Sequence, residues 1–70
     1  MEKIYIRTDF IKLDSLLKLA NAVSSGGEAK NLIAEGLVKV NGEVCTMRGK
    51  KIHPGDRVSF GENEIEIAAE

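Results

Sequence analysis

The stretch SSGGEAKNLIAEGLVKVNGE, residues 24–43, contains the signals of a capped helix followed at once by a hairpin. From Ala29 on, small and apolar residues recur at positions i, i+3, i+4 and i+7, the spacing of an amphipathic helix. Ser25 and Glu28 have the capping-box spacing, in which the serine oxygen accepts from the Glu28 amide and the glutamate reaches back to the serine amide. A glycine then suits the helix end. We therefore predict a short helix over residues 26–35.

Segments with strand-like alternation follow this helix. Residues 38–44, VKVNGEV, alternate around Asn-Gly, the strongest short signal for a two-residue hairpin turn. Residues 57–60, RVSF, and residues 64–68, EIEIA, alternate around a second turn. Between the two hairpins, Pro54 and Gly55 suit the central positions of a type II turn. The second half of the chain therefore predicts two antiparallel hairpins.

The first third of the chain predicts one strand and one more helix. Residues 3–7, KIYIR, alternate as a half-buried strand does. Residues 13–23, LDSLLKLANAV, have helical spacing, with Asp14 as N-cap or first-turn acid. We predict an α+β fold, with two short helices packed on a small, mostly antiparallel sheet. The chain of 70 residues is predicted to form one domain, residues 1–70.

The charges are distributed unevenly along the chain, although the net charge is only −1. Residues 12–53 carry seven basic and four acidic residues, a net +3. Residues 54–70 carry one basic and five acidic residues, a net −4. Because binding responds to the local field of a surface, the basic middle indicates a site for an anionic partner.

Several classes of protein do not fit the composition. No apolar run approaches the roughly 20 residues that a membrane helix needs, and the first residues do not have the pattern of a secretory signal. The single cysteine, Cys45, fits a reducing compartment and is expected to be a small strand residue. We expect a cytoplasmic protein.

The groups that catalysis or metal binding requires are not clustered in the sequence. His53, the only histidine, precedes a proline in a turn, and Cys45 has no evident base beside it. The sequence has no metal-ligand pattern and neither of the common phosphate-binding glycine motifs. We expect a binding protein that is not an enzyme and holds no cofactor or metal.

The start of the predicted helix 26–35 is a candidate anion site. A helix N-terminus presents unpaired amides and a partial positive charge. Gly26 and Gly27 leave these amides open to a close approach. Lys30 lies off the apolar stripe, where its ammonium group can reach the same anion. A solvated interhelical turn is the alternative interpretation of these residues.

Taken in order, the segments KLDSLL, SSGGEAKNLIAEGLVKVNGEV and KKIHPGDRVSF resemble the RNA-binding domain named after ribosomal protein S-four, also called the alpha-L motif. The resemblance covers residues 12–60, and the short chain with its SGG-x-A-K variant is most similar to stand-alone bacterial members of the YbcJ/YaaA-like type. The family pattern has a basic residue before Leu-Asp, a serine and a basic residue around the second helix, then Val-x-Val-Asn-Gly and Pro-Gly-Asp.

The resemblance implies non-catalytic binding of structured RNA, ribosomal or transfer RNA, through the two-helix face and the adjoining hairpin. We expect a role in ribosome assembly or translation and a monomeric protein, with ribosomal proteins as further partners. Two positions depart from the family pattern: Gly26 stands where relatives have arginine, and Met47 where close relatives are basic. The predicted RNA-binding residues are Lys12, Lys18, Ser25, Gly26, Gly27, Lys30, Lys39, Arg48, Lys50 and Lys51.

Two other functions are alternatives to RNA binding. The acidic second hairpin, with Glu62, Glu64 and Glu66, could dock on a basic partner as a protein-interaction module. Sulfur carriers of the β-grasp fold also have Val-Asn-Gly followed by Gly-Asp, but they need a C-terminal Gly-Gly, and this sequence ends in IAAE. The acidic hairpin therefore remains the alternative to RNA binding.

Overall fold

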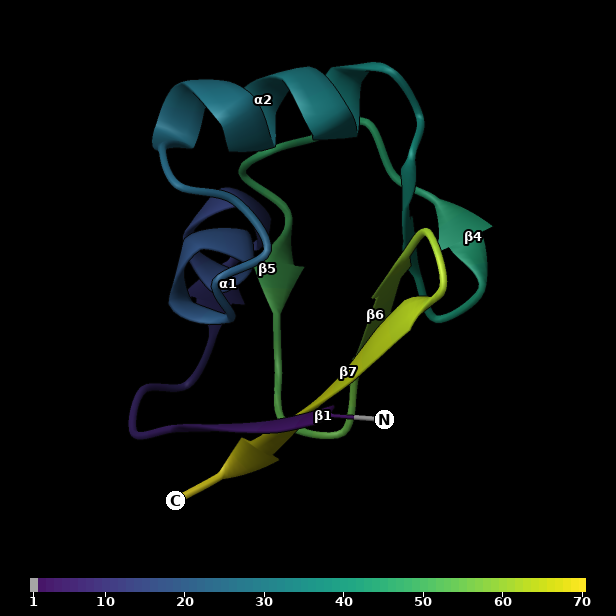
Figure 1. Ribbon diagram of the computed structural model, residues 1–70. Helices are drawn as coiled ribbons and strands as arrows, with labels where there is room; N and C mark the ends of the chain where they lie inside the picture. The colour runs from purple at the N-terminus through teal and green to yellow at the C-terminus, as the bar shows by residue number, and fades with distance from the viewer. Residues whose placement is uncertain (1) are drawn as a thin grey trace.

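The computed structural model describes residues 2–70 as two helices packed against strands (Figure 1). The elements, in chain order, are β1 (Glu2–Ile6), β2 (Ile11–Lys12), α1 (Leu13–Leu19), α2 (Gly26–Ala34), β3 (Val38–Val40), β4 (Glu43–Val44), β5 (Lys51–Ile52), β6 (Arg57–Phe60) and β7 (Asn63–Ala69). A five-stranded sheet has the order β1-β7-β6-β3-β4, and β2 pairs with β5 in a separate two-stranded ladder. The predicted α+β fold is confirmed.

All strand pairs but one are antiparallel. Strand β1 lies parallel to β7, with Glu2 opposite Ile65 and Ile6 opposite Ala69. Alternation within residues 3–7 predicted this strand but could not identify β7 as its partner, because β7 follows it by more than fifty residues in the chain. Both helices cover the same face of the large sheet, where alternate strand residues are buried. The buried core consists of Ile6, Leu13, Leu16, Leu17, Val23, Ala29, Ile33, Val38, Val40, Ile52, Val58, Ile65 and Ile67.

Helix α1 is shorter than predicted and is capped differently. It ends at Leu19 and not near residue 23, and Asn21 then adopts the left-handed conformation, with φ 59°. Of the two roles predicted for Asp14, the structure has the first-turn acid, and its carboxylate accepts from the adjacent amide of Ser15 at 2.7 Å. The N-cap position belongs to Lys12, which makes no side-chain capping bond. The first amides of α1 are instead satisfied by a distant loop, as described below.

Helix α2 starts as predicted, with one change in the cap. The Ser25 Oγ accepts from the Glu28 amide at 3.2 Å. The Glu28 carboxylate reaches back to the Ser24 amide at 3.0 Å and not to that of Ser25. One amide before the helix and one in its first turn are satisfied, as in a capping box, with the reciprocal bond shifted by one residue. Gly36, with φ +77°, reverses the chain after the helix.

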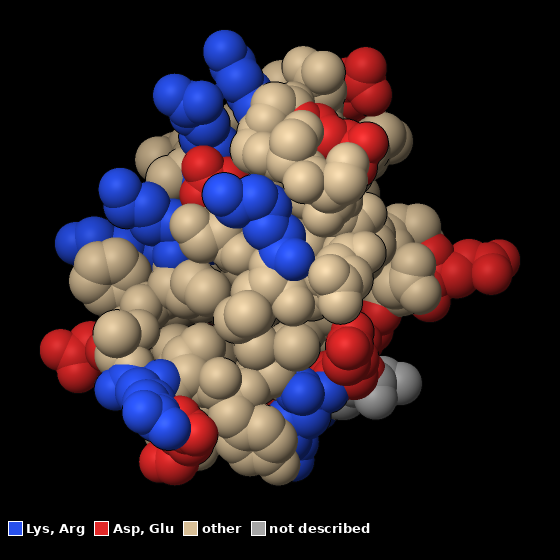
Figure 2. Space-filling model, turned by 60° about the vertical axis from the view of Figure 1, so that its left-hand side comes forward, with Lys and Arg blue, Asp and Glu red and all other residues tan. Residues whose placement is uncertain are grey.

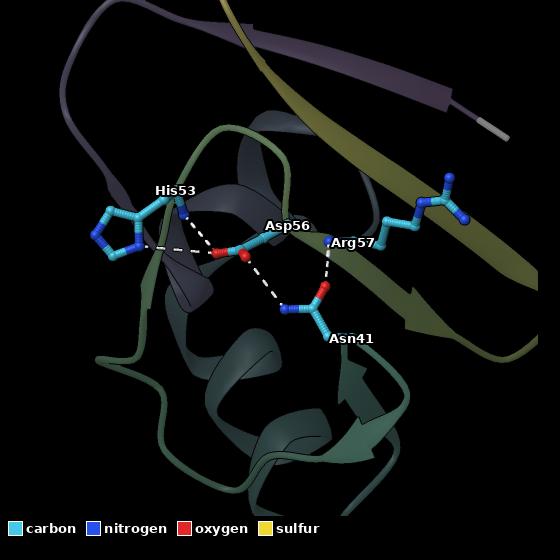
Figure 3. Close-up of polar contacts among 4 residues, drawn as sticks. All are labelled: Asn41, His53, Asp56 and Arg57. Carbon is cyan, nitrogen blue, oxygen red and sulfur yellow. Dashed lines mark hydrogen bonds and ion pairs between the residues drawn. The ribbon is translucent and has the colours of Figure 1, made fainter.

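The two turns that the sequence predicted are tied to each other (Figure 3). Asn41 and Gly42 have positive φ values, as a type I′ hairpin requires, and Gly55 has φ +97° in the His53–Asp56 turn. The Asn41 Nδ2 donates to Asp56 Oδ1 at 3.1 Å, and Asp56 Oδ2 accepts from the His53 amide at 2.8 Å. Asn41 Oδ1 accepts from the Arg57 amide at 2.9 Å. One side chain therefore connects both turns to the start of β6.

The Asp56 carboxylate should make the free energy of unfolding depend on pH in the acidic range. Its burial disfavours ionisation, but the hydrogen bonds from the His53 amide and the Asn41 side chain outweigh this and lower the pKa of Asp56 below 3.8. The unfolded chain then binds the proton more readily than the folded one, so this contribution is present above about pH 4 and is lost as the pH falls through the lowered pKa.

We expect Asp56→Asn to be less stable than the parent at neutral pH by about 1 kcal/mol, the contribution of one hydrogen bond. Urea unfolding at a series of pH values should show this difference shrinking below pH 4, since the parent then loses the charged form as well. Asp9→Asn, at an exposed aspartate, is the control, and its free energy of unfolding should equal that of the parent at each pH. A difference that stays constant down to acid pH would show that the charge of Asp56 does not contribute.

Within residues 2–70, neither helix has the length and apolar character that a membrane crossing would require.

Candidate nucleic-acid interface

Two lysines face each other across the small β2–β5 ladder. Lys12 is paired with Lys51, and Ile11 with Ile52. Ile52 is buried and Ile11 packs against the core. Because neighbouring residues of a strand point to opposite sides, burial of the isoleucine pair directs both lysines to solvent. Like charges directly opposite each other destabilise a ladder, so the fold keeps this pair at a cost.

The loop before β5 is held against the start of α1. The Leu13 amide donates to the Lys50 carbonyl at 2.9 Å, and the Asp14 amide donates to the Arg48 carbonyl at 3.1 Å. The backbone of the loop thus satisfies the amides that a side-chain cap would otherwise bind. This contact places the residues Arg48 and Lys50 close in space to the Lys12–Lys51 pair.

The resulting group of cations is here called the basic surface; it consists of Lys12, Arg48, Lys50 and Lys51. All four residues are exposed. The ion pairs among residues 2–70 are Arg7–Glu70, His53–Asp56 and Arg57–Glu64, and none involves the basic surface. Lys51 makes a cation–π contact, with its Nζ 4.9 Å from the centre of the Phe10 ring. Four cations on adjoining segments, none of them in an ion pair among residues 2–70, attract anions.

Figure 2 shows the side of the molecule that carries the helices. Lysine and arginine side chains gather along the upper left of this face, with a few acidic atoms among them. Acidic side chains are more frequent on the right, and basic and acidic side chains adjoin along the lower edge. The charge asymmetry along the sequence is thus also an asymmetry in space.

The predicted residues of the two helices are exposed and available. Gly26 and Gly27 are the first residues of α2, so their amides have no acceptor within the helix. A Cβ at Gly26 would meet no atom within 4 Å, which leaves room for a ligand to approach the backbone. Lys18 on α1 and Lys30 on α2 are exposed, and the two helices are in contact. Neither lysine has an ion-pair partner among the described residues.

Lys39 lies apart from the other predicted residues. Its neighbours in β3, Val38 and Val40, are buried against the helices, so Lys39 points to the opposite face of the sheet. Its cross-strand partners there are Ser59 and Val44. The Val-x-Val-Asn-Gly pattern located this lysine in the sequence. Because successive residues of a strand point to opposite faces of the sheet, Lys39 faces away from the core-facing valines and lies apart from the basic surface.

Sequence reasoning missed how the basic residues are brought together. It did not foresee the Lys12–Lys51 pairing, because strands of two residues give no periodic signal. It also did not foresee Phe10, whose ring contacts Lys51 and lies 6.2 Å from the His53 ring, centre to centre.

Exposed cations on a two-helix face, supported by a small mixed sheet, define a domain of the alpha-L type. The chain belongs to the S4 domain family, whose model matches residues 4–68. It is 44% identical to YbcJ of Escherichia coli over 59 residues, which are 84% of each chain. It is 46% identical over 65 residues to the "Probable ribosome maturation protein RlbA" of Bacillus subtilis, covering 89% of this chain and 92% of the relative.

Solved structures agree with this assignment. The solution structure of E. coli YbcJ, described as revealing an alpha-L motif involved in RNA binding, superposes with a TM-score of 0.77 at 38% identity. The match covers 99% of this chain and 89% of YbcJ. Heat Shock Protein 15 of Vibrio cholerae matches with a TM-score of 0.68 at 24% identity, over 79% of this chain and 57% of that one, and shares the fold.

Proposed function

We propose that this protein binds structured RNA without catalysing a reaction, and that the RNA is ribosomal. The observation that carries the proposal is the Lys12–Lys51 pair with Arg48 and Lys50 close to it in space, none of which forms an ion pair within residues 2–70. Lys18, Lys30 and the amides of Ser25–Gly27 extend this surface over the helices. The alpha-L motif of YbcJ supports RNA as the ligand, and the name of RlbA supports ribosome maturation as the process.

The chemistry of the surface suits a duplex better than a single strand. A-form RNA is recognised mostly through its shape, phosphates and 2′-hydroxyls, which basic side chains on a rigid platform can contact. Binders of single strands rely on exposed aromatic platforms. The chain has only three aromatic residues, and only Phe10 lies beside the basic surface.

The acidic hairpin is a weaker candidate for the main binding site. Arg57 lies opposite Glu66 in the ladder, and its guanidinium is 4.0 Å from the Glu64 carboxylate. Part of the acidic charge is therefore balanced within the hairpin itself.

A salt series with a structured ribosomal RNA fragment tests the proposal. Each phosphate contact contributes about one unit to the slope of log K against log salt. We expect Lys30→Ala to reduce this slope by about one unit, and Lys30→Glu to weaken binding strongly because it also adds repulsion. Lys39→Ala, an exposed lysine on the opposite sheet face, should change neither quantity. If both Lys30 variants bind like the parent, α2 is not part of the interface.

A further inference from the structure

A groove opens beside the basic surface, between the β3–β4 hairpin and β5. It has a volume of about 610 Å³, within the range of small-ligand sites. One wall carries Val40 and Cys45, and the other carries Lys50, Lys51 and His53. The hydrogen bond between Asn41 and Asp56, which both line the groove, connects the two walls.

The groove is continuous with the proposed RNA interface. Lys50 and Lys51 belong both to its lining and to the basic surface, so RNA bound on that surface passes its opening. The whole protein extends over only 30 × 22 × 18 Å, and a groove of this size in it cannot admit a duplex. A single unpaired nucleotide is the part of a structured RNA that can enter.

The charges of the groove distinguish a base from a phosphate. Glu43 lines it and has no ion-pair partner among residues 2–70, so a phosphate inside would meet a free carboxylate. Asp56 also lines it, but its carboxylate already accepts two hydrogen bonds. Phosphates are therefore favoured outside, at Lys50 and Lys51, and a neutral base inside.

Several side chains can contact a base in this position. The His53 side chain is 56% exposed, so more than half of its surface remains accessible to a base, although its Nδ1 lies 3.8 Å from Asp56 Oδ2. Met47, 66% exposed, and Val44, 56% exposed, also line the groove and supply apolar contact. The free carboxylate of Glu43 accepts hydrogen bonds, which favours cytosine with its amino group over uracil, which has a carbonyl oxygen at the same position.

We propose that this groove receives one unpaired base of the bound RNA, from a bulge or a loop, while Lys50 and Lys51 hold the flanking phosphates. The inference rests on the proposed function and specifies it. Proteins commonly bind unpaired RNA elements in this way: the splayed base stacks on an aromatic ring, here that of His53, and forms hydrogen bonds at its edge.

Two RNA hairpins with the same stem, one fully paired and one with a single bulged cytosine, test the proposal. At one salt concentration and neutral pH, we expect the bulged hairpin to bind about tenfold more tightly, since stacking on a ring contributes about 1–3 kcal/mol per base. A bulged uracil should bind more weakly than the cytosine, and Glu43→Gln should narrow that difference.

Variants of the protein separate the groove from the rest of the interface. His53→Ala should remove most of the bulge preference and leave affinity for the paired hairpin unchanged. Lys18→Ala, outside the groove, should weaken the binding of both RNAs equally and leave the preference for the bulged hairpin unchanged. Equal binding of paired and bulged hairpins by the parent would overturn the groove proposal and leave RNA binding intact. Failure to bind either hairpin at low salt would overturn the proposed function, and the groove proposal with it.

Discussion

Replacing both Lys12 and Lys51 by glutamate is expected to lower RNA affinity by at least about a hundredfold at low salt, because two phosphate contacts are lost and two repulsive charges are added. These lysines form a cross-strand pair at the centre of the basic surface, and the cations beside them depend on the same ladder. Titration of a structured RNA by fluorescence anisotropy measures the loss. Affinity within a few fold of the parent would place the interface elsewhere.

The single variant Lys12→Glu shows that such a loss does not come from unfolding. It replaces a like-charge pair with an opposite-charge pair across the ladder, which should stabilise the protein by about 0.2–1 kcal/mol. RNA binding should still weaken. A variant that folds more stably and binds less tightly would show that the Lys12–Lys51 pair is maintained for a ligand at a cost in stability. Lys39→Glu, at an exposed lysine of β3 whose ladder partners Val44 and Ser59 are uncharged, is the matched control for charge.

The second large effect concerns Ile52, the buried residue of β5. Its side chain is 0% exposed and its strand partner is Ile11. We expect Ile52→Ala to reduce the free energy of unfolding by about 2–5 kcal/mol, because it removes buried methyl groups and leaves a cavity. Since β5 carries Lys51 and follows the loop with Arg48 and Lys50, the variant should also bind RNA less tightly than its folded fraction predicts.

Urea unfolding of three variants checks this expectation. Ile52→Val should lose about 0.5–1.5 kcal/mol, between the parent and Ile52→Ala. Val44→Ala, at a residue that is 56% exposed, should change stability by less than about 0.5 kcal/mol. If Ile52→Ala unfolds at the same urea concentration as Val44→Ala, β5 is not anchored by its isoleucine.

Local signals in the sequence were sufficient to predict most of the helices and strands. Helix α2 begins after Ser25 as its capping box predicts, and both hairpins turn at their glycine-containing segments. These features depend on residues within a few positions of one another, where hydrogen-bond geometry and backbone preference decide. Of the two roles predicted for Asp14, the structure has the first-turn acid and not the N-cap, and Glu28 bonds to the amide of Ser24 in place of that of Ser25. In α1 a tertiary contact, the loop carbonyls of Arg48 and Lys50, satisfies the amides instead.

The sequence by itself determined the helices, the hairpins, the basic middle of the chain and the resemblance to the alpha-L motif. Only the tertiary structure decided that β1 pairs with β7, that Lys12 faces Lys51, and that Lys39 lies on the far side of the sheet. The physical reason is that these arrangements follow from burying residues of distant strands in one shared core, namely Ile6 of β1, Ile65 and Ile67 of β7, Ile52 with Ile11 packed beside it, and the β3 valines. Which side of a strand is buried sets where its charged residues point, and that depends on partners far away in the chain.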